Sequence, residues 1–273
     1  MSGPDGISVA VLGLGEAGGA IATDLVAAGV TVRGYDPAPE VQAPAGVTET
    51  GSEAEAARGC DVVLSVNSAK AAVDALRAGL AGTAAGTVWA DLNTTAPQTK
   101  RTLDGIVADS GSGVAFVDVS LMTPVPGFGL RTPMLVSGGG AARYAELLGP
   151  LGAGVEVLGG PAGLAAERKL LRSVFFKGMA AAVVEALEAG RAAGCEEWLW
   201  GNIADELSRA TDATVQRIVD GSYRHAVRRT TEMQAAGDML VDLGVEPAIA
   251  YASRDLLKRI TGAEPPAPPT ASR

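Results

Sequence analysis

The amino-acid sequence predicts an α/β domain built on a mostly parallel sheet, followed by an all-α domain. Between residues 7 and 158, short runs of branched apolar residues alternate with segments of helical periodicity. This is the order that a parallel sheet covered by helices requires. From residue 161 to about residue 261, only helical periodicity remains. We therefore predict domains at residues 1–160 and 161–262, and a proline-rich, disordered tail at residues 263–273.

Composition and charge exclude several classes of protein. The chain has 273 residues, a formal net charge of -9, one histidine and two cysteines. An acidic chain is poorly suited to nucleic acid or anionic membranes, so we expect neither as a partner. The cysteines lack metal-ligand spacing, so we expect no metal site and reduced thiols in a cytoplasmic protein. The N-terminal apolar run is short and interrupted by glycine, so we expect neither a signal peptide nor a membrane span.

A glycine-rich turn joins the first predicted strand, residues 7–12, to a helical pattern at residues 20–28. Its glycines fit GxGxxG, in which they allow a tight turn, a close approach to a pyrophosphate and helix packing. The next strand, residues 30–35, leads into Asp36, whose carboxylate can accept from ribose hydroxyls. A Rossmann-type domain is thus predicted, with cofactor contacts from Gly13, Leu14, Gly15, Glu16, Ala17, Gly18 and Asp36.

The cofactor expected at this turn is NAD. The charge of Asp36 would repel the 2′-phosphate of NADP, although Arg33 in the same strand keeps NADP open. The alternative is that Asp36 only caps a turn before Pro37.

Further site residues follow later strands, predicted at residues 61–66, 87–92, 114–121, 134–136 and 155–158. Helices are predicted at residues 52–58, 69–80, 95–110 and 141–151. Ligands of such sheets bind beyond the carboxyl ends of the strands. We therefore expect Asn67, Ser68, Asn93 and Thr94 at the cofactor, and the loop at residues 120–129 at the substrate. Thr123 is a candidate for holding a substrate carboxylate, or else a hydroxyl that only stabilises its turn.

The longest predicted helix, residues 162–193, carries a polar stripe. Positions three and four apart share a helix face, which aligns Lys169, Arg172, Ser173, Phe176 and Lys177. Most of the remaining circumference is apolar, so we predict a buried helix whose stripe faces a wet cleft. The alternative is a stripe of solvated charges on the surface.

Positive charge gathers again between residues 222 and 233. Helices are predicted at residues 196–207, 209–220, 222–243 and 247–260. Arg224 with Arg228, and His225 with Arg229, are spaced i, i+4 and form two adjoining stripes on one helix. Arginine side chains there suit a carboxylate or phosphate. Pairing with acidic residues of neighbouring helices is the equal alternative.

Four motifs resemble those of the β-hydroxyacid dehydrogenases, the group that contains 3-hydroxyisobutyrate dehydrogenase. They are GLGEAGGAIA, DLNTTAP, the segment FVDVSLMTPVPGFGLRTPMLVSGG, and GLAAERK. KLLRSVFFKG and RHAVRRTTEM are similar to a phosphogluconate dehydrogenase-like branch with its own C-terminal helical domain. The resemblance implies an NAD(P)-dependent oxidoreductase that transfers hydride between nicotinamide and a small hydroxyacid or oxoacid. It also implies Thr94 beside the nicotinamide, Lys169 as the catalytic residue, and a homodimer that forms through the helical domain.

The chain departs from the family pattern at two places. Ser173 stands where most members have asparagine, and the usual serine-glycine-glycine is replaced around Met122, Thr123 and Pro124. We expect Lys169 to be the general acid-base, with its pKa lowered by burial and by nearby positive charges, and Ser173 to help hold the reacting oxygen. The residues expected at the substrate are Ser120, Met122, Thr123, Pro124, Arg172, Phe176, Lys177, His225 and Arg228.

The sequence is also compatible with two other functions. Imine reductases share the architecture, although they usually have aspartate or tyrosine where Lys169 stands. The chain could also be a nicotinamide-binding sensor without chemistry, which the unusual loop at residues 122–124 favours.

Overall fold

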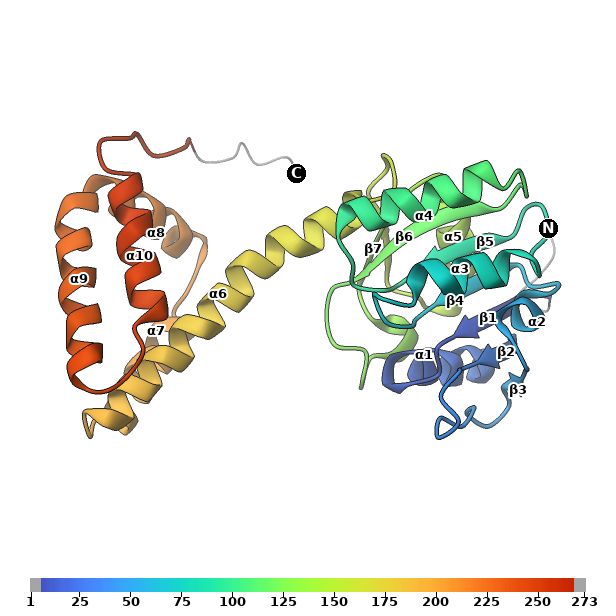
Figure 1. Ribbon diagram of the computed structural model, residues 1–273, viewed down its shortest axis with the longest axis horizontal. Coiled ribbons are helices and arrows are strands. Elements are labelled where there is room, and N and C mark those ends of the chain that lie inside the picture. The colour runs from blue at the N-terminus through green and yellow to red at the C-terminus, as the bar shows by residue number, and fades with distance from the viewer. Residues whose placement is uncertain (1–5, 268–273) are drawn as a thin grey trace. The chain divides into compact units, whose positions relative to one another are not determined.

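The computed structural model describes residues 6–267. The chain divides into two compact units, Met1–Arg172 and Ser173–Arg273. The first unit contains an eight-stranded sheet in the order β3-β2-β1-β4-β5-β6-β7-β8 (Figure 1). Neighbouring strands pair in parallel except β6 and β7, which are antiparallel. The strands are β1 (Ser8–Leu12), β2 (Thr31–Tyr35), β3 (Thr48–Glu49), β4 (Val62–Ser65), β5 (Val88–Asp91), β6 (Ala115–Leu121), β7 (Met134–Ser137) and β8 (Val155–Val157).

Helices cover both faces of this sheet, so alternate residues along a strand enter different cores. In β1, Val9 and Val11 join the core under α1 (Glu16–Ala27) and α5 (Ala141–Leu148). Ala10 and Leu12 join the core under α2 (Glu53–Ala57), α3 (Ala72–Leu80) and α4 (Pro97–Asp109). The ring of the fully buried Trp89 belongs to this second core. The predicted fold class, a Rossmann-type sheet followed by an all-α region, is confirmed.

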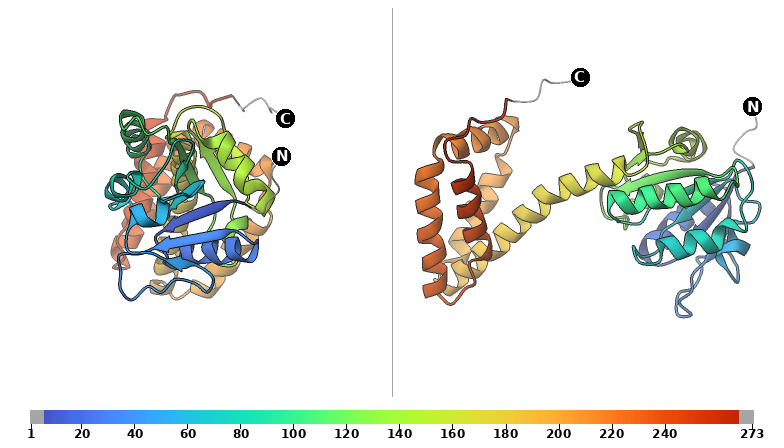
Figure 2. Two further views of the ribbon diagram at one scale, coloured as in Figure 1. Left: turned by 90° about the vertical axis from the view of Figure 1, so that its right-hand side faces the viewer. Right: turned by 45° about the horizontal axis from the view of Figure 1, so that its top comes forward.

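Helix α6 (Leu164–Ala192) enters the second unit, which continues with α7 (Glu196–Ser208), α8 (Asp212–Arg224), α9 (Ala226–Asp242) and α10 (Ala248–Arg259). Helices α9 and α10 lie side by side (Figures 1 and 2). A Cβ atom at Gly237 would overlap the Tyr251 ring, so only glycine permits this approach. The Glu185 carboxylate of α6 accepts from the backbone N–H groups of Ile249 and Ala250 at 2.6 and 2.8 Å. These bonds attach the start of α10 to α6.

Some predicted elements differ from the observed ones. The two-residue strand β3 was not predicted, and the predicted helix at residues 141–151 ends at Leu148, where a 3₁₀ turn (Gly149–Leu151) follows. The predicted helix at residues 95–110 begins only at Pro97, in line with the preference of proline for the first helical position. The predicted domain boundary after residue 160 stays a prediction. Residues 263–267 form neither helix nor strand, and the rest of the predicted tail lies outside the described residues.

The break between α8 and α9 corrects a prediction about positive charge. The sequence placed a helix boundary near Gly221, but α8 begins at a capping box made by Thr211 and Thr214 and continues through Gly221 to Arg224. His225 leaves the helical conformation, with φ -113° and ψ 21°, and α9 begins after it. Arg224 and Arg228 therefore lie on different helices, and the prediction of two i, i+4 stripes on one helix was wrong.

The expectation that α6 is buried within the chain was also wrong. Leu171, Val174 and Phe175 are 57%, 76% and 61% exposed. These side chains are exposed despite their apolar character. In the part of the chain that the structure describes, no helix is long and apolar enough to cross a membrane.

Candidate dinucleotide and proton-transfer site

The glycine turn between β1 and α1 has the geometry that its sequence predicts. Gly13 has φ +95°, a left-handed conformation that disfavours other residues. A Cβ atom on Gly18 would overlap the carbonyl oxygen of Gly13, so α1 packs against the turn only because this position is glycine. A Cβ atom on Gly15 would meet nothing within 4 Å and would project into open space. The turn thus leaves room for a ligand at the N-terminus of α1, where anions bind well.

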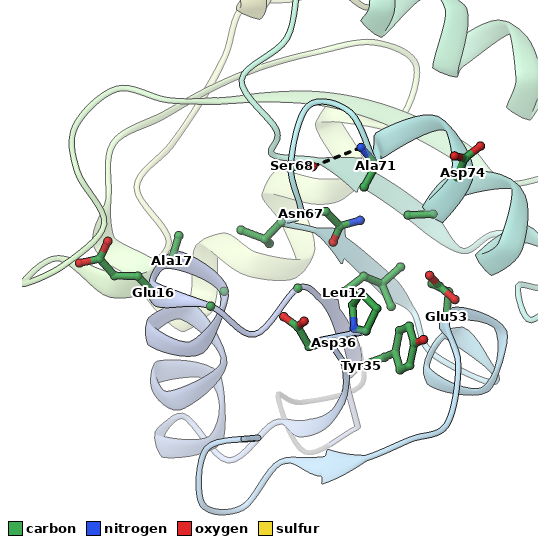
Figure 3. Close-up of a pocket in the computed structure, with 16 residues that line it drawn as sticks. Leu12, Glu16, Ala17, Tyr35, Asp36, Glu53, Asn67, Ser68, Ala71 and Asp74 are labelled. Atoms are coloured by element: carbon green, nitrogen blue, oxygen red, sulfur yellow. Dashed lines mark hydrogen bonds between the residues drawn. The ribbon is translucent and has the colours of Figure 1, made fainter. Parts of the chain in front are cut away.

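A pocket of about 600 Å³ lies against this turn (Figure 3). Its walls contain eight of the predicted cofactor residues: Gly13, Gly15, Glu16, Ala17, Gly18, Asp36, Asn67 and Ser68. Sequence reasoning missed the other lining residues, namely Leu12, Tyr35, Pro37, Glu53, Val66, Ala71, Asp74 and Ala75. Leu14 lies within the turn, whereas Asn93 and Thr94 follow β5 and do not line the pocket.

Asp36 stabilises its turn and also lines the pocket. Its Oδ2 accepts from the backbone N–H of Leu14 at 2.7 Å, and its Oδ1 accepts from that of Ala38 at 2.9 Å. These bonds stabilise the turn after β2 and fix the carboxylate against the glycine loop. The side chain also lines the pocket (Figure 3). Arg33 points elsewhere, because its Nη1 donates to the carbonyl oxygen of Arg58 at 2.7 Å.

Two predicted site residues meet at the start of α6. The Nζ atom of Lys169 donates to Thr94 Oγ1 at 2.8 Å, across 75 positions of sequence. Thr94 directly follows the buried Asn93, whose Nδ2 donates to Ser65 Oγ at 3.2 Å. Lys169 is half-buried. A lysine amine is thereby held beside the carboxyl end of β5.

The predicted substrate loop lies partly within reach of the same helix. Arg172 Nη1 donates to the carbonyl oxygen of Met122 at 3.2 Å. Thr123 Oγ1 is buried and makes no hydrogen bond among the described residues, while Pro124 is exposed. Ser120 lies buried on β6 and is paired across the sheet with Leu135. Within this group, the structure brings Arg172 into hydrogen-bonding distance of Met122.

The other predicted substrate residues belong to the second unit. Ser173, Phe176 and Lys177 continue along α6. His225 and Arg228 help to line a hollow of about 500 Å³ at the break between α8 and α9. The guanidinium of Arg228 lies 3.2 Å from the Glu232 carboxylate, so part of the positive charge is already paired. Among the described residues, no group of histidine, cysteine and acidic side chains is arranged to hold a metal.

A dinucleotide-binding domain is what this turn, pocket and sheet define. The chain belongs to the family described as the NAD binding domain of 6-phosphogluconate dehydrogenase, whose model matches residues 8–151. Residues 191–260 match a second model, described as a domain of unknown function (DUF1932). The predicted resemblance is confirmed by these two matches.

Similar proteins are known at the levels of sequence and structure. An uncharacterized 28.5 kDa protein in the 7S RNA 5′ region of Methanothermus fervidus is 24% identical over 174 residues. The match covers 63% of this chain and 66% of that protein, just under two thirds of its length. A solved conserved protein of unknown function, MTH1747, described as similar to 3-hydroxyacid dehydrogenases, is 28% identical, with a TM-score of 0.59 over 93% of this chain and 98% of its own. An imine reductase from Myxococcus stipitatus, solved in complex with NADP+, is 17% identical, with a TM-score of 0.72 over 92% of this chain and 93% of its own.

Proposed function

We propose that the protein is an NAD(P)-dependent oxidoreductase that transfers hydride between nicotinamide and a small hydroxyacid or oxoacid. The observation that carries this proposal is the hydrogen bond from Lys169 Nζ to Thr94 Oγ1. It holds an amine at the carboxyl end of a parallel strand, the edge at which such sheets bind their ligands. The family match supports a dinucleotide on the same domain.

The residues of the pocket fit a dinucleotide. Gly13, Gly15 and Gly18 would receive the pyrophosphate at the start of α1, and Asp36 would accept from the adenosine ribose. Glu53 and Asp74 add two carboxylates to the walls (Figure 3). Because a 2′-phosphate would face these like charges, we propose NAD as the preferred cofactor. The similar imine reductase was solved with NADP+, so the preference must be measured directly. Titration with NADH and NADPH should show NADH binding at least about tenfold more tightly.

Lys169 would move the proton of the reaction. A bound nicotinamide supplies or accepts the hydride. As a carbonyl is reduced, the Lys169 ammonium donates a proton to the oxygen, and in the reverse direction the amine accepts one. Thr94 accepts from one N–H of Lys169 and so fixes the direction of the ammonium group. We further propose that Ser173 helps to hold the reacting oxygen.

The substrate acid would be held near the loop at residues 120–129. The Thr123 hydroxyl is buried and makes no hydrogen bond to the described residues. Buried hydroxyl groups usually have a hydrogen-bond partner, because an unpaired one is costly. A substrate carboxylate would supply that partner. We propose that Arg172, which donates to the Met122 carbonyl oxygen of this loop, helps to set the charge of the acid. The roles of Lys177, His225 and Arg228 at the substrate stay predictions.

Replacement of Lys169 by alanine tests the proposal. Loss of a general acid-base lowers turnover by about 10²- to 10⁴-fold, while NADH affinity should change little because Lys169 does not line the pocket. Lys258→Ala is the matched control, since Lys258 is an exposed lysine in the second unit. Undiminished turnover in Lys169→Ala would refute the assignment. A panel of oxoacids, hydroxyacids and cyclic imines, followed by NADH absorbance, supplies the substrate for this assay.

An imine reductase is the second candidate function, supported by the shared fold with the Myxococcus stipitatus enzyme. Turnover of cyclic imines without turnover of any oxoacid in the same panel would favour it. Tight NADH binding without turnover of any substrate would instead favour a nicotinamide-binding sensor without chemistry.

The cytoplasmic location stays a prediction.

We also propose a homodimer that covers the apolar face of α6 with a second copy of the chain. The exposed side chains of this helix include Leu171, Val174, Phe175 and Val184. Apolar patches of this kind are uncommon on monomers and are typical of interfaces. A second copy supplies a matching patch by symmetry.

A further inference from the structure

A cluster of buried charges joins α4, β5 and β6. The Nζ atom of Lys100 lies 2.6 Å from Asp91 Oδ2 and 3.4 Å from Asp118 Oδ1. It also donates to the carbonyl oxygen of Asp91 at 2.6 Å. All three residues have no exposed surface. A buried ion is costly unless it is paired and hydrogen-bonded, so each member of this cluster requires the others.

Asp118 uses its second oxygen to hold the start of α6. Its Oδ2 accepts from the backbone N–H groups of Gly163 and Ala166, both at 3.0 Å. Ser137 Oγ donates to the same oxygen at 3.3 Å and accepts from the N–H of Ala165 at 3.0 Å. The first amides of a helix have no acceptor within the helix, and an anion is favoured at that end. The origin of α6 is therefore fixed to β6 and β7.

Asp91 fixes the other partner of the Lys169–Thr94 contact. Its carboxylate accepts from Asn93 Nδ2 through Oδ1. Thr94 is the next residue in the chain, so the hydrogen bonds of Asn93 restrain the backbone that carries the Thr94 hydroxyl. Lys100 contacts both Asp91 and Asp118. It therefore connects the carboxylate that binds Asn93, next to Thr94, with the carboxylate that binds the first amides of α6.

We propose that Lys100, acting through Asp91 and Asp118, is a positioning residue that sets the approach of Lys169 to Thr94. Lys169 follows Ala166 by three residues and so lies on the same face of α6, within one turn of the anchored amides. A displacement of about 1 Å at a reacting group costs about 100-fold in rate. The effect of this positioning on catalysis rests on the proposed function. The effect of the cluster on the position of Lys169 does not.

The double variant Lys100→Met/Asp118→Asn tests the coupling. It removes one charge of each sign, so the net charge of the cluster is unchanged and an unpaired lysine is avoided. Two measurements need no substrate: hydrogen exchange of the amides at residues 163–167, and acetylation of Lys169 by acetic anhydride, normalised to the exposed Lys70. The chain has five lysines, which mass spectrometry resolves individually.

We expect the amides at the start of α6 to exchange about 10- to 100-fold faster, as the loss of hydrogen bonds to a charged group predicts. The acetylation rate of Lys169 should change severalfold. Lys258→Met, the same replacement at an exposed lysine, should alter neither measurement. Ser137→Ala removes the acceptor of the Ala165 N–H without changing any charge, and it should give a smaller change in the same direction even if the double variant fails to fold.

Unchanged exchange in folded variants would overturn the anchoring of α6. If the amides exchange faster but the acetylation rate of Lys169 is unchanged, the cluster stabilises the start of α6 without positioning Lys169. This result would overturn the positioning role. An active Lys169→Ala protein would refute the proposed function while leaving both measurements interpretable. Failure of the inference is thus distinguishable from failure of the proposed function.

Discussion

Gly18 shows how much a single residue decides in this domain. The sequence alone predicts its role, because the spacing GxGxxG encodes a local geometry of strand, turn and helix. The structure adds the atom that it contacts, the carbonyl oxygen of Gly13. In contrast, the link between Lys100 and Asp118 joins residues on separate elements, and local patterns carry no information about such pairs. Residues of a local motif, such as Gly18, are therefore predictable from sequence. Pairs on separate elements, such as Lys100 and Asp118, become visible only in the folded structure.

A methyl group at position 18 should weaken the cofactor site. In Gly18→Ala the new Cβ atom overlaps Gly13, so α1 must shift, at a cost of about 1–3 kcal/mol in the free energy of unfolding. We expect NADH affinity to fall as well, measured by titration calorimetry. Gly105→Ala is the control, because a Cβ atom there meets nothing within 4 Å. This control should be neutral or stabilise by about 0.5–1 kcal/mol, and equal affinities in the two variants would contradict the prediction.

The two cysteines should react very differently. Burial raises the pKa of the Cys60 thiol, whereas Cys195 is exposed. A thiol reagent should modify Cys195 rapidly at pH 8 and Cys60 only after unfolding, since the thiolate is the reactive form. In the unfolded chain Cys60 ionises at the ordinary pKa of a thiol, while the folded thiol keeps its proton, so the free energy of unfolding should fall as the pH rises above that ordinary pKa. Mass spectrometry after labelling reports both sites, and equal rates would contradict this.

At the scale of elements, helix boundaries were the weakest predictions. The sequence predicted separate helices at residues 209–220 and 222–243, on either side of Gly221. The structure continues α8 through Gly221 and ends it at Arg224. This helix starts at a capping box formed by Thr211 and Thr214. Propensity is a weak signal, and the contacts that each helix makes override it.

The cap of α8 gives a test at this scale. Thr211→Ala removes the N-cap side chain of this capping box, in which the Thr214 hydroxyl accepts from the N–H of Thr211 at 3.0 Å. Loss of such a cap costs about 1 kcal/mol, which urea denaturation followed by circular dichroism measures. Thr231→Ala, an exposed position within α9, is the control and should change stability by less than about 0.5 kcal/mol. Equal losses would argue that the cap does not stabilise α8.

At the scale of the molecule, the apolar face of α6 was predictable but its covering was not. The pattern around Val174 and Phe175 predicts burial, yet the chain leaves these residues exposed. A sequence pattern shows that a face avoids water without showing which chain covers it.

The proposed homodimer is tested by the molecular mass in solution. Sedimentation equilibrium should give twice the mass of the 27.4 kDa chain. Val174→Asp should shift the protein toward monomer, because a charge in an apolar interface is costly. Val157→Asp is the matched control, since Val157 is an exposed valine on β8. A wild-type protein that remains monomeric at working concentration would refute the dimer.

The distribution of tryptophan makes the two units optically distinct. Trp89 has no exposed surface and lies in the sheet, whereas Trp198 and Trp200 are 68% and 63% exposed on α7. Acrylamide should therefore quench the emission of the α7 pair in the native protein and spare that of Trp89. A Trp89→Phe protein would isolate the signal of the helical unit, so the unfolding of that unit could be followed in the intact chain without an added label.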